Sequence, residues 1–358
     1  MSCYRPLWGY AYPIDHPKYG QYKILPVTRN NCDLQREINS QGKVWSFDRD
    51  TGLVYDLIRI PCGKCIGCKL DYAREWSARI VMESLDYPDR SLFVTLTYDD
   101  DHLPCYIEDS KQLYHGVDLA KRYGVIRGAT LFKKDVQDWL KRLRFTVFYN
   151  YDECNRLPIR YYLAGEYGSK GHRPHYHVCL FGLPNDLVQE GVSKLGDPLF
   201  QSQLINETWS QGFTVVGRLN ASTASYTARY TLKKAQGQDD SYNDALGIER
   251  EFVCMSRRPG IGLNFYNKNK DEIYKSDEII LPAISKDKSN IVRPPRYFDI
   301  LYSIEDPKRM AKIKSDRNIA RDLLNLNELN GVQLNEVDYL ELKENIRADK
   351  IKKLIRDL

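Results

Sequence analysis

Alternating apolar and polar residues predict β-strands in the middle of the chain. Residues 91–98 are rich in β-branched and aromatic side chains, and residues 159–166 and 175–181 form two further short apolar segments. The last two are separated by a polar stretch with two glycines and a proline, which is typical of a turn. They therefore predict a β-hairpin.

Apolar residues at helical spacing predict helices around these strands. Residues 71–85 and 130–148 have such a stripe, and residues 220–237 begin with Asn, Ser and Thr and end at a glycine. A short helix over 200–209 and a strand over 213–216 are predicted between the hairpin and the last of these helices. This order predicts an α+β fold, with helices packed mainly on one face of an antiparallel sheet.

The pattern divides the chain into three segments. Residues 1–69 show no sustained period and contain a cysteine cluster, whereas residues 70–303 contain the elements above. Residues 304–358 are highly charged, with apolar residues at helical spacing on either side of Asn330 and Gly331. They predict two amphipathic helices, which we expect to pack on the domain.

The composition indicates a globular protein without a membrane span. The chain has 358 residues and a mass of 41.7 kDa, 42% of its residues are hydrophobic, and its mean hydropathy is −0.54. No apolar run reaches the roughly 18 residues that a membrane helix requires, and the first residues lack the pattern of a signal peptide. We therefore expect the protein to stay in the cytoplasm of the cell that makes it.

Nine cysteines, an odd number, argue against a secreted disulfide framework. Cys62, Cys65 and Cys68 are separated by two residues each, which suits a metal knuckle. A structural zinc ion would need a fourth ligand, for which Cys3 and Cys32 are the candidates. An iron–sulfur cluster is the alternative, although the usual continuation of the ferredoxin motif is missing. Three reduced cysteines in a turn, without a metal, are the simplest interpretation.

Two histidines of the predicted hairpin form a candidate metal site. Alternate side chains of a strand share a face, so His175 and His177 point the same way. Glu166 lies at the end of the partner strand, where its carboxylate would reach both rings. Two nitrogens and one oxygen, with coordination positions left open, suit Mn²⁺ or Mg²⁺. A histidine pair alone is more often structural, and His172 falls in the turn and is left out of the site.

The predicted helix over 220–237 carries possible nucleophiles. Tyr226 and Tyr230 stand four residues apart and Lys233 three further on, so all three share one face. Two phenols and an ammonium group facing a metal site suggest attack on a phosphate. With 26 tyrosines in the chain, such a pair also arises by chance.

Charge adds only weak evidence for a nucleic-acid partner, because the net charge is +5. Basic residues gather in the predicted helix over 130–148, and the tyrosines supply rings on which bases can stack. An ordinary solvated helix face explains the basic run equally simply. Its members are Lys133, Lys134, Lys141, Arg142 and Arg144.

Together these motifs resemble the HUH rolling-circle endonucleases, which have a histidine pair, an upstream glutamate and a downstream Tyr-x-x-x-Tyr helix. The segments GEYG…RPHYH, PCGKCIGCKLDYAREW, SRRPGIGLNFY and RPPRYFD are similar to the replication initiator of the small circular single-stranded DNA phages, the Microviridae, and of their gokushovirus branch in particular. The similarity extends from about Cys62 to about Tyr302.

The resemblance implies an HUH endonuclease fold with a ferredoxin-like sheet in residues 70–303. It implies one Mg²⁺ or Mn²⁺ ion, held by Glu166, His175 and His177, that polarises the scissile phosphate of single-stranded DNA at the viral origin. A tyrosine then attacks and leaves a 5′-phosphotyrosine and a free 3′-hydroxyl. The strand around Thr95 resembles the first strand of the HUH initiators, with a face that either lines the DNA groove or contains threonines as good strand formers.

The resemblance also assigns roles outside the metal site. Tyr226 and Tyr230 would alternate, so that one starts a round of rolling-circle replication and the other lets the product be rejoined into a circle. Lys233 would stabilise phosphate charge or lower the phenol pKa from its usual value near 10. A host polymerase would extend the 3′ end, and a host helicase is expected because no P-loop motif is found. A cysteine near the N-terminus is frequent in the family, which favours Cys3 as the fourth zinc ligand.

A different class of function uses the same residues without catalysis. The alternative is a zinc-bearing DNA-binding or scaffolding protein in which the histidines hold a structural ion. A relaxase or transposase is disfavoured, because the relaxase tyrosine lies near the N-terminus and many transposases use a single tyrosine.

Overall fold

The computed structural model describes residues 3–16, 20–26, 45–47, 54–107, 112–153, 156–168, 171–193, 196–233, 240–281, 290–330, 332–334 and 336–356. The chain separates into two compact units. One consists of Met1–Tyr72 with Arg296–Leu358, and the other is Ala73–Pro295. The two ends of the chain, treated above as separate segments, thus belong to one unit.

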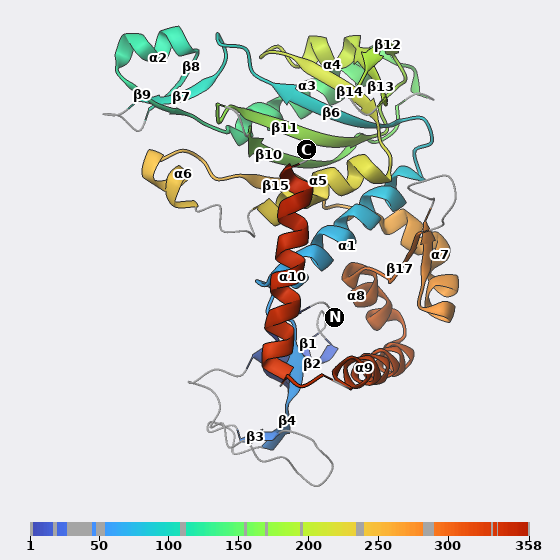
Figure 1. The fold of residues 1–358 in the computed structure, drawn as a ribbon. Coiled ribbons are helices and arrows are strands. Elements are labelled where there is room, and N and C mark those ends of the chain that lie inside the picture. Colours follow the sequence, from blue (N-terminus) through green and yellow to red (C-terminus); the bar gives the residue numbers. More distant parts are fainter. Residues whose placement is uncertain are drawn as a thin grey trace. The chain divides into compact units, whose positions relative to one another are not determined.

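Among the described residues of Ala73–Pro295, seven strands form an antiparallel sheet (Figure 1). Its order is β12-β13-β14-β6-β11-β10-β15, so the predicted hairpin β10/β11 and the strand β6 lie at its centre. The strands are β6 (Ser91–Thr97), β10 (Arg160–Tyr167), β11 (Pro174–Phe181), β12 (Leu187–Val192), β13 (Pro198–Ser202), β14 (Thr214–Arg218) and β15 (Phe252–Met255). Its strands and helices confirm the predicted α+β class.

One face of the sheet is covered by helix α3 (Lys133–Asn150) and the short helix α4 (Gln203–Thr208), as Figure 1 shows. Strand β6 directs Leu92, Val94 and Leu96 to this face, where they are almost completely buried in the main hydrophobic core. The predicted apolar stripe of α3 supplies the opposing side, with Trp139 and Leu143 fully buried. Because apolar residues alternate along β6, the opposite face of the sheet must hold its remaining side chains.

The opposite face is covered by helices as well, which corrects the prediction that helices pack mainly on one face. Helix α5 (Ala221–Lys233) packs on β10 and β11, and helix α1 (Ile66–Ser84) places Trp76 5.1 Å from the ring of Tyr162 in β10. The physical reason is visible in the hairpin, whose strands are buried at nearly every position rather than at alternate ones. Strands covered on both faces read as continuous apolar runs.

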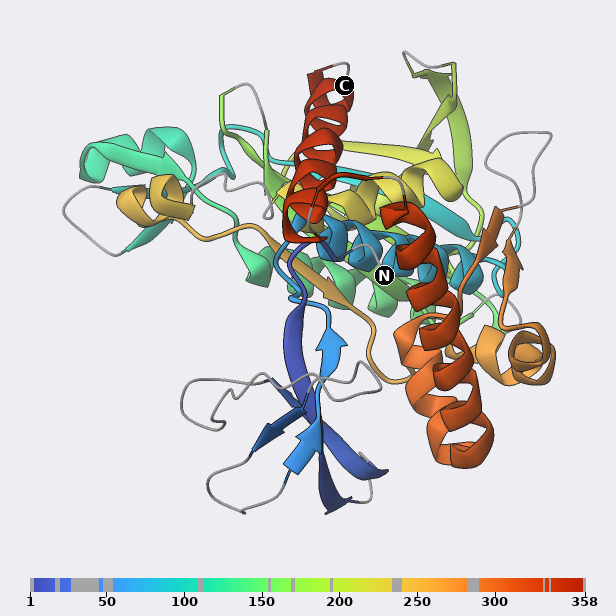
Figure 2. The same ribbon diagram turned by 60° about the horizontal axis from the view of Figure 1, so that its bottom comes forward.

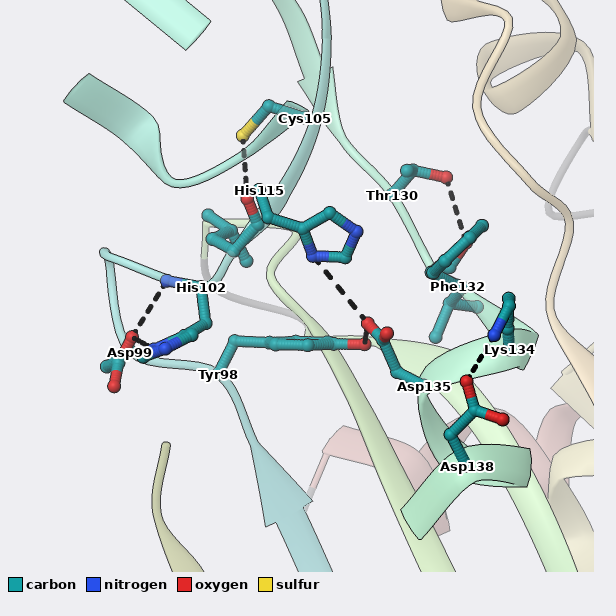
Figure 3. Close-up of polar contacts among 12 residues, drawn as sticks. Tyr98, Asp99, His102, Cys105, His115, Thr130, Phe132, Lys134, Asp135 and Asp138 are labelled. Carbon is teal, nitrogen blue, oxygen red and sulfur yellow. Dashed lines mark hydrogen bonds and ion pairs between the residues drawn. The ribbon is translucent and has the colours of Figure 1, made fainter. Parts of the chain in front are cut away.

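A buried polar network anchors the hairpin on its α3 face (Figure 3). The hydroxyl of Tyr98 donates to Asp135 Oδ2 at 2.8 Å and lies 2.9 Å from the hydroxyl of Tyr176, which also accepts from the backbone N–H of Phe132 at 2.9 Å. Burial raises the pKa of both phenols well above the usual value for tyrosine. They therefore stay neutral, and Tyr176 is held in place between the two histidines of its strand.

Smaller elements complete this unit. Strands β7, β8 and β9 form a second sheet with helix α2 against it, and strand β16 pairs with β17. These elements are β7 (Pro104–Ile107), β8 (Leu113–His115), α2 (Val117–Tyr123), β9 (Ile126–Ala129), α6 (Asp240–Leu246), α7 (Leu263–Ser276), β16 (Ile279–Leu281) and β17 (Asn290–Val292).

The other unit contains small sheets and three helices, with the long strands β1 and β2 in dark blue in Figure 2. Strands β2, β1 and β5 form one sheet, and β3 pairs with β4. The elements are β1 (Leu7–His16), β2 (Gly20–Pro26), β3 (Trp45–Phe47), β4 (Val54–Asp56), β5 (Ile58–Ile60), α8 (Arg296–Glu305), α9 (Pro307–Leu329) and α10 (Glu336–Arg356). The two predicted C-terminal helices are therefore present as α9 and α10.

The expected packing of the C-terminal apolar stripes is wrong for several of their residues. Ile319, Leu323 and Leu324 of α9 are each more than half exposed, and Val337 of α10 is 73% exposed. Ile351 of α10 is buried. Amphipathic spacing predicted the helices correctly, but it did not predict how much of each stripe a neighbour would cover.

Candidate active site

The register of the hairpin places the three predicted metal ligands together. Glu166 in β10 lies directly opposite His175 in β11, and Ala164 lies opposite His177. The turn is closed by a hydrogen bond from Gly168 N–H to the carbonyl of Arg173 at 2.9 Å, and Gly171 adopts a left-handed backbone with φ +78°. Since alternate side chains share a face, all three ligand candidates point toward the α5 side of the sheet.

One carboxylate oxygen contacts both imidazoles. Glu166 Oε1 lies 2.9 Å from His175 Nε2 and 2.8 Å from His177 Nε2. The Glu166 side chain is 2% exposed, and those of His177 and His175 are 8% and 19% exposed. The ligand atoms of the three residues lie within 4.8 Å of one another, so they could share a single ion.

The far nitrogens of both rings are held by neighbouring groups. Nδ1 of His175 lies 3.2 Å from the carbonyl oxygen of Arg173, and Nδ1 of His177 lies 3.0 Å from Thr95 Oγ1. A carbonyl oxygen only accepts, so Nδ1 of a neutral His175 carries the proton in this contact. Its Nε2 then presents a lone pair to the carboxylate. This arrangement, with the outer nitrogen bonded and the inner one unprotonated, is typical of metal-binding histidines.

The donor set suits a divalent cation. Two lone pairs facing each other at 2.8–2.9 Å repel unless a positive charge lies between them, whether a proton or a metal ion. A carboxylate and two imidazoles are ligands that Mn²⁺ accepts, and a carboxylate is a ligand of Mg²⁺. The residues therefore fit the ion that the sequence predicts.

Two residues of β6 complete the surroundings of His177, and their roles were not predicted from the sequence. Thr95 lies opposite His177 in the sheet and contacts its Nδ1, and the ring of Phe93 stacks on the imidazole with centroids 5.4 Å apart and an interplanar angle of 10°. Sequence alternation already places Phe93, Thr95 and Thr97 on one face. The missing information is the pairing of β6 with β11, which lies between segments about 80 residues apart.

Helix α5 brings Tyr226 to the same place. Its start is capped reciprocally, because Asn220 Oδ1 accepts from Thr223 N–H at 2.9 Å and Thr223 Oγ1 accepts from Asn220 N–H at 2.9 Å. The helix buries only small side chains against the sheet, namely Ala224, Thr227 and Ala228. Small side chains allow a close approach, shown by the contact of 3.4 Å between Cys179 Sγ and Thr227 Oγ1.

The phenol ring of Tyr226 packs against the candidate metal site. Its centroid lies 5.2 Å from that of His177 and 6.1 Å from that of Phe93, both in edge-to-face geometry. The side chain is 36% exposed, so the ring contacts the site while remaining accessible to a substrate. The structure thus brings the predicted nucleophile and the predicted ligands together.

The other two predicted residues of the helix are placed only along its axis. Tyr230 and Lys233 belong to α5, four and seven residues after Tyr226. At 3.6 residues per turn these positions fall on the same side of a helix as Tyr226. Their side chains lie outside the described part of the chain, as does the whole of Lys234.

The structure supports leaving His172 out of the site. It lies in the hairpin turn, where its Nε2 is 3.1 Å from Asn243 Oδ1 and its ring stacks on Tyr167 at 4.5 Å. Its neighbours in the turn, residues 169 and 170, lie outside the described residues.

The basic run of α3 does not face this site. Helix α3 covers the opposite face of the sheet, and Lys134 and Lys141 both pair with Asp138. Arg142 and Arg144 donate to the backbone carbonyls of Thr208 and Ile159, both at 3.0 Å. Most of this positive charge therefore stabilises the fold, which agrees with the simpler of the two interpretations of the run.

The comparisons with known proteins point to one family. The family of the replication-associated protein ORF2 matches residues 91–235, which include β6, the hairpin and α5. The Replication-associated protein ORF2 of Spiroplasma virus 4 is 34% identical over 282 residues, covering 77% of this chain and 78% of that protein. The Replication-associated protein VP4 of Bdellovibrio phage phiMH2K is 30% identical over 259 residues, covering 71% and 72%.

A third relative, the Replication-associated protein ORF4 of Chlamydia phage 1, is 27% identical over 227 residues, or 62% of this chain and 49% of that protein. No solved structure matches the chain significantly. The chain therefore belongs to the family of phage replication-associated proteins. The resemblance to a phage replication initiator is confirmed.

No helix within the described residues is long and apolar enough to cross a membrane.

Proposed function

We propose that this replication initiator nicks single-stranded DNA at the viral origin, with Tyr226 as a nucleophile. The observation that supports this most directly is the packing of the Tyr226 ring against His177, whose Nε2 shares a carboxylate oxygen of Glu166 with His175. A partly exposed phenol beside a buried set of metal donors is the arrangement that phosphodiester transfer to a tyrosine requires.

The chemistry divides between the ion and the protein. A divalent ion bound by Glu166, His175 and His177 would neutralise charge on the non-bridging phosphate oxygens. The oxygen of Tyr226 forms a bond to phosphorus as the bond from phosphorus to the 3′ oxygen breaks. The phenol proton is released and the departing 3′ oxygen becomes a hydroxyl, which leaves the 5′ phosphate on the tyrosine. Thr95 and the carbonyl of Arg173 hold the rings in position during this step.

The rest of the proposed cycle uses the remaining residues of α5. Tyr230, one turn after Tyr226, is the second nucleophile, and Lys233 stabilises phosphate charge. The free 3′-hydroxyl primes rolling-circle synthesis by a host polymerase with a host helicase, in the cytoplasm of the bacterial host. When the second tyrosine attacks the regenerated origin, the released 3′-hydroxyl attacks the first phosphotyrosine and closes the circle.

The proposal is tested with the full-length protein and its own circular single-stranded genome. We expect Mn²⁺ or Mg²⁺ to give a covalent protein–DNA adduct on a denaturing gel, and EDTA to abolish it. Tyr226→Phe and Tyr230→Phe, singly and together, identify the attacking tyrosine. Tyr149→Phe is the matched control, because Tyr149 is 65% exposed but lies in α3 on the opposite side of the sheet.

The outcome also separates the two classes of function. An adduct that persists in the double variant would refute the assignment of the nucleophiles. Folded protein that binds its genome but forms no adduct under any metal condition would favour the non-catalytic DNA-binding or scaffolding protein.

A further inference from the structure

A second cluster of metal-binding side chains lies in the unit formed by the two ends of the chain. The sulfur atoms of Cys3, Cys62, Cys65 and Cys68 all lie within 4.8 Å of one another. Three come from the loop and first turn that lead into α1, and the fourth comes from the N-terminal segment, 59 residues before Cys62. Chain folding has therefore assembled a four-thiol site that the sequence shows only as three residues and two candidates.

The separations of the sulfurs match those of four ligands around one ion. Cys62 Sγ lies 3.9 Å from Cys68 Sγ, and Cys65 Sγ lies 3.8 Å from Cys3 Sγ. A tetrahedral site with zinc–sulfur bonds of about 2.3 Å has sulfurs about 3.8 Å apart. The two pairs share no cysteine, so they correspond to two opposite edges of one tetrahedron.

The same distances disfavour the alternatives. A disulfide requires sulfurs at about 2.0 Å, and all four cysteines are free. In a four-iron cluster each thiolate binds a different iron at the corners of a cube, which separates the sulfurs more widely than ligands that share one ion. Four thiolates around a single ion are typical of structural zinc.

Backbone N–H groups are directed at the sulfurs, as expected for thiolates. Cys65 N–H donates to Cys62 Sγ at 3.2 Å, and Lys64 N–H donates to the same sulfur at 3.4 Å. Cys65 Sγ accepts from Tyr4 N–H at 3.3 Å and from Cys68 N–H at 3.5 Å. Helix α1 begins at Ile66, so the positive end of its dipole also lies at the cluster. These contacts offset the negative charge that four thiolates bring.

We propose that Cys3, Cys62, Cys65 and Cys68 bind one structural zinc ion that fastens the N-terminal segment to the start of α1. Glu344 of α10 lies at the same junction, because its Oε1 accepts from Ile66 N–H at 3.4 Å and its Oε2 accepts from Arg5 Nε at 2.7 Å. The zinc site therefore holds together three parts of the unit that are distant in sequence.

The site explains how this unit is stabilised. Its strands β1, β2 and β5 are few, and much of the apolar surface of α9 and α10 is exposed, so its hydrophobic core is small. Small units of this kind commonly depend on a metal. Because zinc binds the assembled thiolates and not the separated ones, its binding free energy contributes to folding.

The first test measures metal content in full-length protein purified without added metal. We expect one zinc and no iron per chain by mass spectrometry. Cys3→Ser should lose its zinc on dialysis against a chelator that leaves the wild-type site filled. Cys254→Ser is the matched control, because Cys254 is a free, partly buried cysteine in β15 outside the cluster.

A second measurement does not depend on a variant that folds. Wild-type protein produced with Co²⁺ should show the intense visible bands of a tetrahedral thiolate complex, which a site made of nitrogen and oxygen ligands does not produce. Iron with sulfide, a zinc content unaffected by Cys3→Ser, or a Co²⁺ spectrum without thiolate bands would each overturn the proposal. None of these readouts uses DNA, so the result is independent of the proposed nicking activity.

Discussion

Replacing Thr95 by valine removes one hydrogen bond from His177 with little change in shape. Valine has the size and β-branching of threonine, so strand β6 keeps its packing. The Nδ1–H of His177 would lose its partner at 3.0 Å, in a side chain that is only 8% exposed and has limited access to water. An unsatisfied buried donor costs about 1–3 kcal/mol, which corresponds to roughly 5- to 150-fold in affinity. We therefore expect Mn²⁺ to bind Thr95→Val about 10- to 100-fold more weakly than wild type.

Isothermal titration of Mn²⁺ into the apoprotein measures this effect without DNA. Thr97→Val is the matched control, because Thr97 lies two residues further along the same face and its hydroxyl donates to the carbonyl of Phe213 at 3.1 Å. Thr95→Ser should restore binding, since it restores the hydroxyl. Unchanged Mn²⁺ affinity in Thr95→Val, or an equal loss in Thr97→Val, would refute the reasoning that Thr95 positions His177.

Three further predictions concern the stability of the sheet. Tyr176→Phe leaves the N–H of Phe132 without its acceptor at 2.9 Å, so we expect the urea midpoint to correspond to a loss of about 1–3 kcal/mol; an unchanged midpoint would contradict this. Burial raises the pKa of Tyr98 and Tyr176, so only the unfolded chain releases these protons near pH 10. The unfolding free energy should therefore fall as pH rises above about 10, by about 1.4 kcal/mol per pH unit for each phenol, and less steeply in Tyr98→Phe. Glu83→Gln removes the buried ion-pair partner of Arg160 and should cost about 3–5 kcal/mol in the same assay, a prediction that a loss below about 1 kcal/mol would exclude.

Local patterns were sufficient to predict the elements that carry the candidate site. The apolar segments around a glycine-containing turn predicted the hairpin, and alternation placed His175 and His177 on one face. Glu166 was placed beside them because the length of a hairpin turn sets its register, which the pairing of Glu166 with His175 confirms. In the same way, the spacing of Tyr226 and Tyr230 required only the geometry of one helix.

Pairings between distant segments could not be predicted in this way. Thr95 reaches His177 only because β6 is the neighbour of β11, and nothing in either strand specifies that neighbour. The prediction of helices on one face was wrong because a periodic pattern shows which side of a helix is apolar and not which side of a sheet receives it. Helix α1 also begins at Ile66, five residues before the predicted start, which places Cys68 in its first turn.

The amino-acid sequence by itself thus determined the α+β class, the hairpin with its three candidate ligands, the tyrosine helix and the resemblance to phage replication initiators. These features depend on the order and spacing of residues within short segments, where backbone geometry leaves few alternatives. Only the tertiary structure decided that α5 places Tyr226 against His177 and that Cys3 joins the cysteines near α1. Both depend on which buried surfaces pack together, a property of the whole chain and not of any one segment.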